Sequence, residues 1–440
     1  MPIKSFKTKN GSFLSSHPDG LIILFFTEMW ERFSYYGMRA ILVLYLVSET
    51  NSENPGLGWT NAEAIKLYGW YTALVYLACV PGGIIADKFI SSQKGVFWGG
   101  ILLCLGHLSL AVDNIIFFYL GLSLIIFGVG LLKPSISSLV GSLYKENDIK
   151  RDQGFTVFYI GINIGAFFAS IVVGYVGEVF GWHYGFSLAG IGMILGQTVF
   201  IFGQRKIQSK KIKKTLISSQ KLKNFEIDRI KLIFISSTIL IIFWASFEQA
   251  GGLMNIFTYQ KTDRFLEFID FEVPASWFQS INPLMIILLG FYVSAFWYFL
   301  EKKNIVNSSI FKISVGIIIM GLGFVFMYFA ALEFETKGKS SMYWLVLAYL
   351  FHTLGELCAS PVILSYITKL SPKRIVSSVM GLYFAAIGIG NKLAGSVGQY
   401  SEKFGEKLVF LSITLICISV GIIVIIFNKK LSKLSHGVDS

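Results

Sequence analysis

The sequence of 440 residues is poor in charge. Asp, Glu, Lys and Arg together make up 15% of it, while 54% of the residues are hydrophobic. Soluble domains average about 25% charged residues, so this shortage excludes an ordinary soluble enzyme or binding domain. Long apolar stretches separate the charged segments instead. The composition therefore predicts an integral membrane protein whose chain crosses the bilayer many times.

The sequence also lacks the cysteine spacings that are typical of disulfide-bonded domains and of metal sites. The four cysteines, Cys79, Cys104, Cys358 and Cys417, lie in apolar runs without metal-ligand spacing, so we expect small buried side chains and no metal. No small-residue cleavage site follows the first apolar run, which we expect to remain as a span. The net charge of +12 lies mostly in short loops, where positive-inside topology explains it better than nucleic-acid binding.

Apolar runs bounded by charged or turn-rich segments predict an all-α protein with about twelve transmembrane helices. They lie near residues 20–47, 62–86, 95–112, 115–141, 154–178, 184–204, 231–258, 276–300, 308–332, 342–370, 375–400 and 407–428. Loops rich in Lys and Arg alternate with poorer ones, and residues 48–61 contain neither. This alternation predicts a multi-pass protein of a bacterial-type inner (plasma) membrane, with both termini in the cytoplasm.

A basic segment divides the spans into two sets of six. We expect an N-terminal six-helix bundle in residues 1–204, a basic cytoplasmic linker in 205–230 and a C-terminal six-helix bundle in 231–440. Six plus six spans with such a linker is the layout of major facilitator transporters, whose halves rock around a midplane site. The segment Gly82-Gly83-Ile84-Ile85-Ala86-Asp87-Lys88 resembles the loop motif of that superfamily.

The first span carries charges on one helical face. Glu28, Glu31, Arg32, Tyr35 and Arg39 follow one another at i, i+3, i+4, i+7 and i+11. A charge at mid-membrane costs about 3 kcal/mol, so this face must meet a wet or paired interior. Ion pairs that only hold helices together are the alternative, but they need fewer charges. We therefore predict a functional site here.

Other spans contain isolated charges at matching depths. Lys133 precedes Pro134 in the fourth span, Glu248 lies in the seventh and Glu356 in the tenth. Because successive spans run in opposite directions, Arg39 and Glu248 share a depth on the outer side, and Lys133 and Glu356 share one near the midplane. Each combination has one member per half, as alternating gates require, although equal depth does not prove contact.

The run Glu28-x-x-Glu31-Arg32-Phe33-Ser34-Tyr35-Tyr36-Gly37 resembles the first-helix motif of the proton-dependent oligopeptide transporter family (POT/PTR) of the major facilitator superfamily. Further matches follow in the family's order over nearly the whole chain: Lys133-Pro134, Phe158-Tyr159-Ile160-Gly161-Ile162-Asn163, Glu248-Gln249, Asn282-Pro283, Gly355-Glu356-Leu357 and Ser360-Pro361. The resemblance implies a major facilitator fold that imports di- and tripeptides with protons.

The same resemblance implies roles for individual residues. Arg32 and Lys133 would receive the peptide carboxylate, and Glu356 and Asn282 would hold its amino terminus. Six residues would line the pocket: Tyr35, Tyr36, Tyr76, Asn163, Trp244 and Ser360. Proton coupling would rest on Glu28, Glu31, Arg32, Glu248 and Arg39. A zwitterionic backbone of nearly fixed length suits a cationic cluster that faces an acid across a cavity.

The sequence departs from the family at three places. Residues 205–231 are too short and polar for the two extra helices of many bacterial members, Ala250-Gly251-Gly252 replaces Gly-Ser-Ser, and Leu382-Tyr383-Phe384 replaces a Trp-Phe pair. The last two bear on side-chain selectivity.

Two alternatives remain open: a symporter for another small zwitterion or anion, and a nutrient receptor that binds without transporting. The sequence shows no nucleophile–base pair of the kind that would indicate an enzyme. The expected partners are a small peptide, protons and the bilayer, with no nucleic acid. We expect a monomer without a cofactor, driven by the proton gradient.

Overall fold

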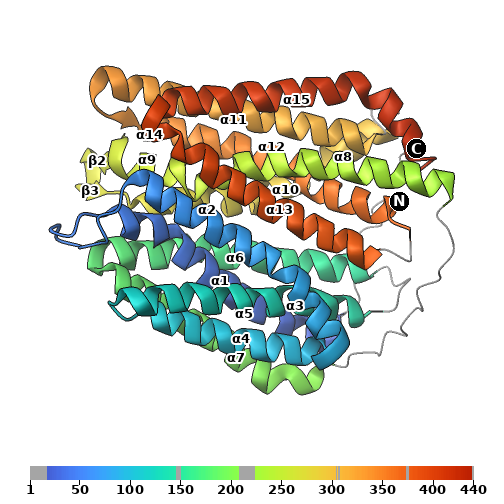
Figure 1. Ribbon diagram of the computed structural model, residues 1–440, viewed down its shortest axis with the longest axis horizontal. Coiled ribbons are helices and arrows are strands. Elements are labelled where there is room, and N and C mark those ends of the chain that lie inside the picture. Colours follow the sequence, from blue (N-terminus) through green and yellow to red (C-terminus); the bar gives the residue numbers. More distant parts are fainter. Residues whose placement is uncertain are drawn as a thin grey trace.

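The computed structural model describes residues 17–144, 150–207, 223–303, 305, 308–372 and 376–438, most of them in long helices that lie side by side (Figure 1). Within these residues, nine helical segments are long and apolar enough to cross a membrane, which makes the chain a multi-pass membrane protein. Helices α1 (Asp19–Val47), α4 (Ser92–Leu110) and α13 (Val376–Gln399) run among them. With these three, the described chain has the twelve long helices that the hydropathy pattern predicts.

The N-terminal half contains α1, α4 and four further long helical segments. These are α2 (Asn61–Leu77) continued by α3 (Cys79–Ile85) and the π-helical turn η2 (Ala86–Ile90), α5 (Ile115–Ser142), α6 (Lys150–Tyr175) continued by η3 (Val176–Phe180), and α7 (Trp182–Gly203) continued by η4 (Gln204–Lys206). The loop before α2 ends in a capping box, in which Thr60 and Glu63 satisfy the first free backbone N–H groups.

The C-terminal half contains α13 and the remaining long helices. They are α8 (Asn224–Phe247) with η5 (Glu248–Ala250) and α9 (Leu253–Lys261), η7 (Ala275–Ser280) with α10 (Ile281–Lys302), α11 (Ser309–Lys337), α12 (Met342–Leu370), and α14 (Ser401–Phe404) before α15 (Glu406–Leu434). Two small sheets connect them: β1 (Thr262–Asp263) pairs in parallel with β4 (Ser340–Ser341), and β2 (Phe265–Leu266) pairs with β3 (Phe271–Glu272) around η6 (Glu267–Ile269).

The seventh span differs from its predicted form. The sequence predicts one apolar helix near residues 231–258, whereas α8 ends at Phe247 and α9 begins only at Leu253. Gly251 and Gly252 lie in the interruption, and glycine is a poor helix former by about 1 kcal/mol relative to alanine. The interruption places Glu248 in a 3₁₀ turn at the boundary between the two halves.

The two ends of the bundle differ. Both described chain ends lie at one end, and the loop after α1, the small sheets and α14 lie at the other, which we call the far end (Figure 1). At the far end the halves touch: α1 contacts α9, and α6 contacts η7. Most of the predicted linker, residues 208–222, lies outside the described residues, so the division at 205–230 stays a prediction.

Helices α2 and α13 pack against each other across the two halves. Gly69 and Gly395 meet backbone to backbone, and a Cβ built on Gly395 would lie 2.6 Å from the Gly69 Cα atom. Neither helix can carry a larger residue here without separating from the other.

We expect Gly395→Ala to lower the melting temperature in detergent and to reduce transport, because overpacking at a backbone contact costs about 1–3 kcal/mol. The matched control is Gly290→Ala in α10, where the nearest atom, Leu357 Cδ2, would lie at an ordinary 3.7 Å. That variant should melt at or above the wild-type temperature. Equal melting temperatures for the two variants would contradict the packing argument.

Candidate functional site

A cavity of about 210 Å³ lies between the two halves. Residues of α1, α2, α5 and α6 form its wall in the N-terminal half, and residues of α8, η5, η7, α10, α12 and α13 form the wall in the C-terminal half. They are Tyr36, Arg39, Tyr76, Lys133, Tyr159, Ile162, Asn163, Ala166, Ser170, Trp244, Phe247, Ala250, Gln279, Asn282, Pro283, Ile286, Tyr349, His352, Glu356, Ser360, Tyr383, Phe384 and Ile387.

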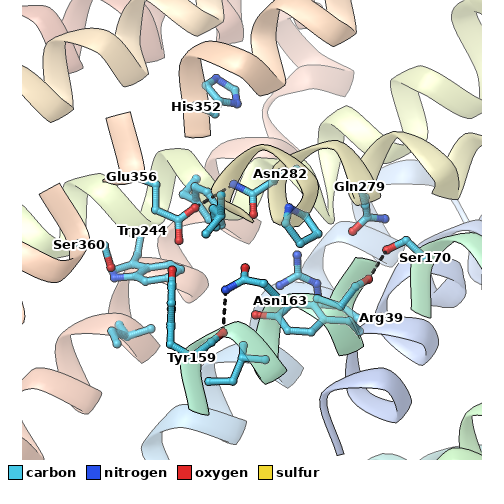
Figure 2. Close-up of a pocket in the computed structure, with 18 of the residues that line it drawn as sticks. Arg39, Tyr159, Asn163, Ser170, Trp244, Gln279, Asn282, His352, Glu356 and Ser360 are labelled. Carbon is cyan, nitrogen blue, oxygen red and sulfur yellow. Dashed lines mark hydrogen bonds between the residues drawn. The ribbon is translucent and has the colours of Figure 1, made fainter. Parts of the chain in front are cut away.

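The C-terminal wall holds one carboxylate, Glu356, which is 8% exposed. The amide nitrogen of Asn282 donates to Glu356 Oε2 at 2.8 Å and lies 3.1 Å from Thr353 Oγ1 (Figure 2). Asn282 stands at the start of α10, and Glu356 lies in the middle of α12, so two helices orient one acidic group. The amide partner fixes the carboxylate without neutralising its charge.

The N-terminal wall holds a cation, Lys133, whose ammonium lies 4.1 Å from the centre of the Tyr76 ring. No carboxylate forms an ion pair with Lys133 among the described residues. The sequence predicts that Lys133 and Glu356 lie at a similar depth. Both side chains line the same cavity, but they do not form an ion pair with each other. A cavity with a cation on one half and an anion on the other is suited to a small molecule with both charges.

The part of the charged face of α1 from Glu28 to Tyr35 lies behind this wall. Arg32 Nη2 donates to Glu31 Oε1 at 2.6 Å, Arg32 Nε donates to Glu31 Oε2, and Glu28 Oε1 lies 3.4 Å from Arg32 Nε. The Arg32 guanidinium lies 5.2 Å from the Tyr35 ring and 5.8 Å from the Tyr36 ring. Of this group only Tyr36 lines the cavity, so Arg32 is separated from it by an aromatic ring and is held by two acids.

A second ion pair connects the halves beside the cavity. Arg39 Nη1 lies 3.1 Å from Glu248 Oε1, and the Tyr68 hydroxyl donates to the same carboxylate. All three side chains are buried. Gly251 is required here, because a Cβ at this position would overlap the Tyr68 hydroxyl. The predicted pairing of Arg39 with Glu248 is therefore a direct contact.

The structure brings most of the predicted site residues together. Eight of the ten predicted substrate-binding residues line the cavity: Tyr36, Tyr76, Lys133, Asn163, Trp244, Asn282, Glu356 and Ser360. The other two, Arg32 and Tyr35, lie behind it with Glu28 and Glu31. Of the predicted coupling residues, Arg39 lines the cavity and Glu248 contacts it through Arg39. The roles themselves stay predictions.

Several lining residues were not predicted. Tyr159 accepts a hydrogen bond at its carbonyl from Asn163 Nδ2 at 2.9 Å, one helical turn away, and this i, i+4 spacing could have indicated it (Figure 2). Tyr383 replaces a residue of the family pattern, which was a further signal. Gln279 lies in the 3₁₀ turn before α10, where no periodic pattern marks a site.

Among the described residues, no group of three or more His, Cys, Asp or Glu side chains is close enough to hold a metal ion. Three histidines, His17, His107 and His352, are buried, and none of them belongs to such a cluster. The polar side chains that line the cavity offer charges and hydrogen-bonding groups to a ligand.

Comparisons with known proteins agree with this geometry. The sequence model of the POT family matches residues 93–227 and 219–416. A protein named peptide transporter YePEPT, from Yersinia enterocolitica, is 34% identical over 98% of this chain and 99% of its own length. A di-/tripeptide transporter of Lactococcus lactis is 33% identical over 95% of this chain and 96% of its own length.

Among solved structures, a mutant of peptide transporter POT in complex with alafosfalin has a TM-score of 0.87 and 32% identity, covering 97% of each chain. The predicted fold class, two six-helix halves of the major facilitator type, is thereby confirmed.

Proposed function

Because this chain belongs to the POT family, we propose that it is a proton-coupled symporter that imports di- and tripeptides by alternating access. One observation carries this function: a cavity between the halves holds a lysine on one half, without an ion pair to any described residue, and a carboxylate on the other. A small peptide is a zwitterion whose charged ends lie at a nearly fixed distance, whatever its side chains. Such a cavity recognises the backbone and leaves the side chains variable.

The peptide carboxylate binds Lys133, and its amino terminus binds Glu356 and Asn282. Tyr36, Tyr76, Asn163, Trp244 and Ser360 form the walls around it. Arg32 joins Lys133 at the carboxylate only after Glu31 releases it, and Tyr35 and Tyr36 must shift for this to happen. Substrate binding is thus linked to the charge state of the first helix.

Protons act at two places. Protonation of Glu28 or Glu31 weakens the hold on Arg32 and frees the guanidinium for the peptide. Protonation of Glu248 weakens the pair with Arg39, which connects the halves. A carboxylate couples to transport only if its pairing differs between the two states of the protein, and in the proposed cycle each of these acids gives up its arginine partner on protonation.

The positive-inside rule places both termini and the linker in the cytoplasm of a bacterial-type inner (plasma) membrane. The far end then faces outward, and the contacts there hold the outer side closed. We propose that the chain acts as a monomer in the lipid bilayer, without a cofactor, and performs no enzymatic reaction. The proton gradient is its energy source.

A symporter for another small zwitterion or anion is the second candidate, because the same two charges would serve it. Retention of Glu28 and Glu31 favours peptides, since relatives that transport nitrate have lost these acids. A receptor that binds without transporting would show no gradient-dependent accumulation.

The first test is dipeptide uptake into proteoliposomes with and without an inward proton gradient. The gradient should drive accumulation in the wild type, and Lys133→Ala should abolish it, because the peptide carboxylate then lacks its cation. The control is Lys392→Ala: this lysine lies within α13, bonded to Ser396 Oγ at 2.8 Å and away from the cavity lining. Wild-type accumulation in folded Lys133→Ala would refute the assignment.

Blocking either end of a dipeptide should weaken its competition for uptake more than changing its side chains does. A charge-assisted hydrogen bond contributes about 1.5–3 kcal/mol, roughly tenfold to hundredfold in affinity. In a Lys133→Ala protein, measured by equilibrium binding, the difference between free and amidated dipeptide should shrink. Equal competition by amidated and free peptides in the wild type would remove Lys133 and Arg32 from the carboxylate site.

Glutamine at Glu28, Glu31 or Glu248 should abolish proton-driven accumulation but leave peptide counterflow at least partly intact. Counterflow needs no net proton movement. Glutamine has the size of glutamate but can neither bind nor release a proton. Loss of both activities in all three variants would make these acids structural. Full accumulation in any one variant would exclude that residue from coupling.

A further inference from the structure

A second carboxylate joins the two halves at the far end, and neither the cavity nor the charged face of α1 contains it. Glu178 lies in η3, at the far end of α6. Its Oε2 atom accepts from the Ala275 backbone N–H at 2.8 Å, and its Oε1 atom accepts from the Ser276 N–H at 2.8 Å and the Ser276 hydroxyl at 2.5 Å. All three donors belong to η7 of the C-terminal half. The Glu178 side chain therefore accepts hydrogen bonds from the first free backbone N–H groups of η7, which belongs to the other half.

The surrounding backbone is shaped for this contact. Ser276 is fully buried, and a Cβ on Gly174 of α6 would overlap its hydroxyl. The Trp277 indole donates to the carbonyl of Ile171, one turn before Gly174 in α6, at 2.9 Å. Glycine at position 174 thus lets η7 approach α6 closely enough for the Glu178 carboxylate to reach it.

One cation faces the carboxylate in the described part of the chain. Arg264 Nη1 lies 3.9 Å from Glu178 Oε2, but Arg264 is held by its own half: it donates to the Val273 carbonyl, and its Nη2 lies 2.8 Å from Glu272 Oε1. The Glu272 side chain is 63% exposed to solvent, whereas the Glu178 side chain is 8% exposed. The shared arginine therefore favours an ionised Glu178 without being the group that holds it.

We propose that Glu178 is a proton-operated latch of the far end, separate from the Arg39–Glu248 pair. The ionised carboxylate accepts all three hydrogen bonds and holds η7 against α6. A protonated carboxyl group is a weaker acceptor than a carboxylate, so its bonds to the two backbone N–H groups of η7 weaken and the halves can separate more easily. This latch rests on the alternating access of the proposed function, but not on the identity of the substrate.

The latch can be tested by the distance between the halves. Asn51, in the loop after α1, and Lys339, in the loop before α12, are exposed at the far end. In the full-length protein with its four cysteines replaced, spin labels at Asn51→Cys and Lys339→Cys report this distance by double electron–electron resonance. At pH 8, Glu178→Gln should raise the ratio of far-end-open to closed molecules by about tenfold, the value of one charge-assisted hydrogen bond.

The matched control is Glu272→Gln, which removes a carboxylate from the same arginine but no bond between the halves. Its distance distribution should equal that of the wild type. Acidification to pH 5 should increase the open population in the wild type. In Glu178→Gln that increase should be smaller, because this variant has already lost the carboxylate of the latch.

Ser276→Ala provides a second, milder variant. It removes one of the three bonds and should shift the distance in the same direction by less than Glu178→Gln, even where the stronger variant does not fold. An unchanged distance in folded Glu178→Gln, or an equal shift in Glu272→Gln, would overturn the latch. Failure of peptide uptake with the expected distances would instead contradict the proposed function and leave the latch standing.

Discussion

Each buried charge in this protein must find a partner, because the bilayer offers it neither water nor counterions. Arg32 has Glu31 and Glu28, and Arg39 has Glu248 and the Tyr68 hydroxyl nearby. In the described part of the chain, Lys133 lies over the Tyr76 ring and Glu356 accepts from the Asn282 amide, and neither forms an ion pair. These two groups line one cavity from opposite halves. Because the other buried charges named here are already in ion pairs, a charged ligand gains most free energy by binding beside Lys133 and Glu356.

The same constraint connects the site to the shape of the molecule. Glu248 reaches Arg39 because its helix is interrupted at Gly251 and Gly252, and Gly251 leaves room for Tyr68. Glu178 reaches η7 because Gly174 leaves room for Ser276. At both places, glycine allows a polar contact between the halves that a side chain would prevent. Since polar contacts break and re-form more readily than interdigitated apolar cores, they are suitable places for two halves to separate.

Much of this architecture could be predicted from the sequence, because the bilayer imposes it. Hydropathy alone places the twelve spans, and the spacing of Glu28, Glu31, Arg32 and Arg39 places the charges on one face. The sequence does not reveal which charges pair, because that depends on the rotation and depth of helices from the other half. Arg39 meets Glu248, yet Lys133 does not meet Glu356 at a similar depth. Glu178 could not be predicted as a contact between the halves, because an acid at the end of a span is typical of the membrane interface. Gln279 could not be predicted either, because it lies in a turn without hydrophobic periodicity.

In the proposed cycle, proton and peptide act on one group, Arg32. In this structure two acids hold it behind Tyr36, so its charge is unavailable to the cavity. A peptide carboxylate near Lys133 would gain from a second cation, but taking Arg32 leaves Glu28 and Glu31 as adjacent buried charges without compensation. A proton on one of them removes that cost. Under this proposal, proton and peptide each make the other's binding more favourable, and by reciprocity neither is held tightly alone. Such mutual dependence is what a symporter needs in order to avoid carrying one without the other.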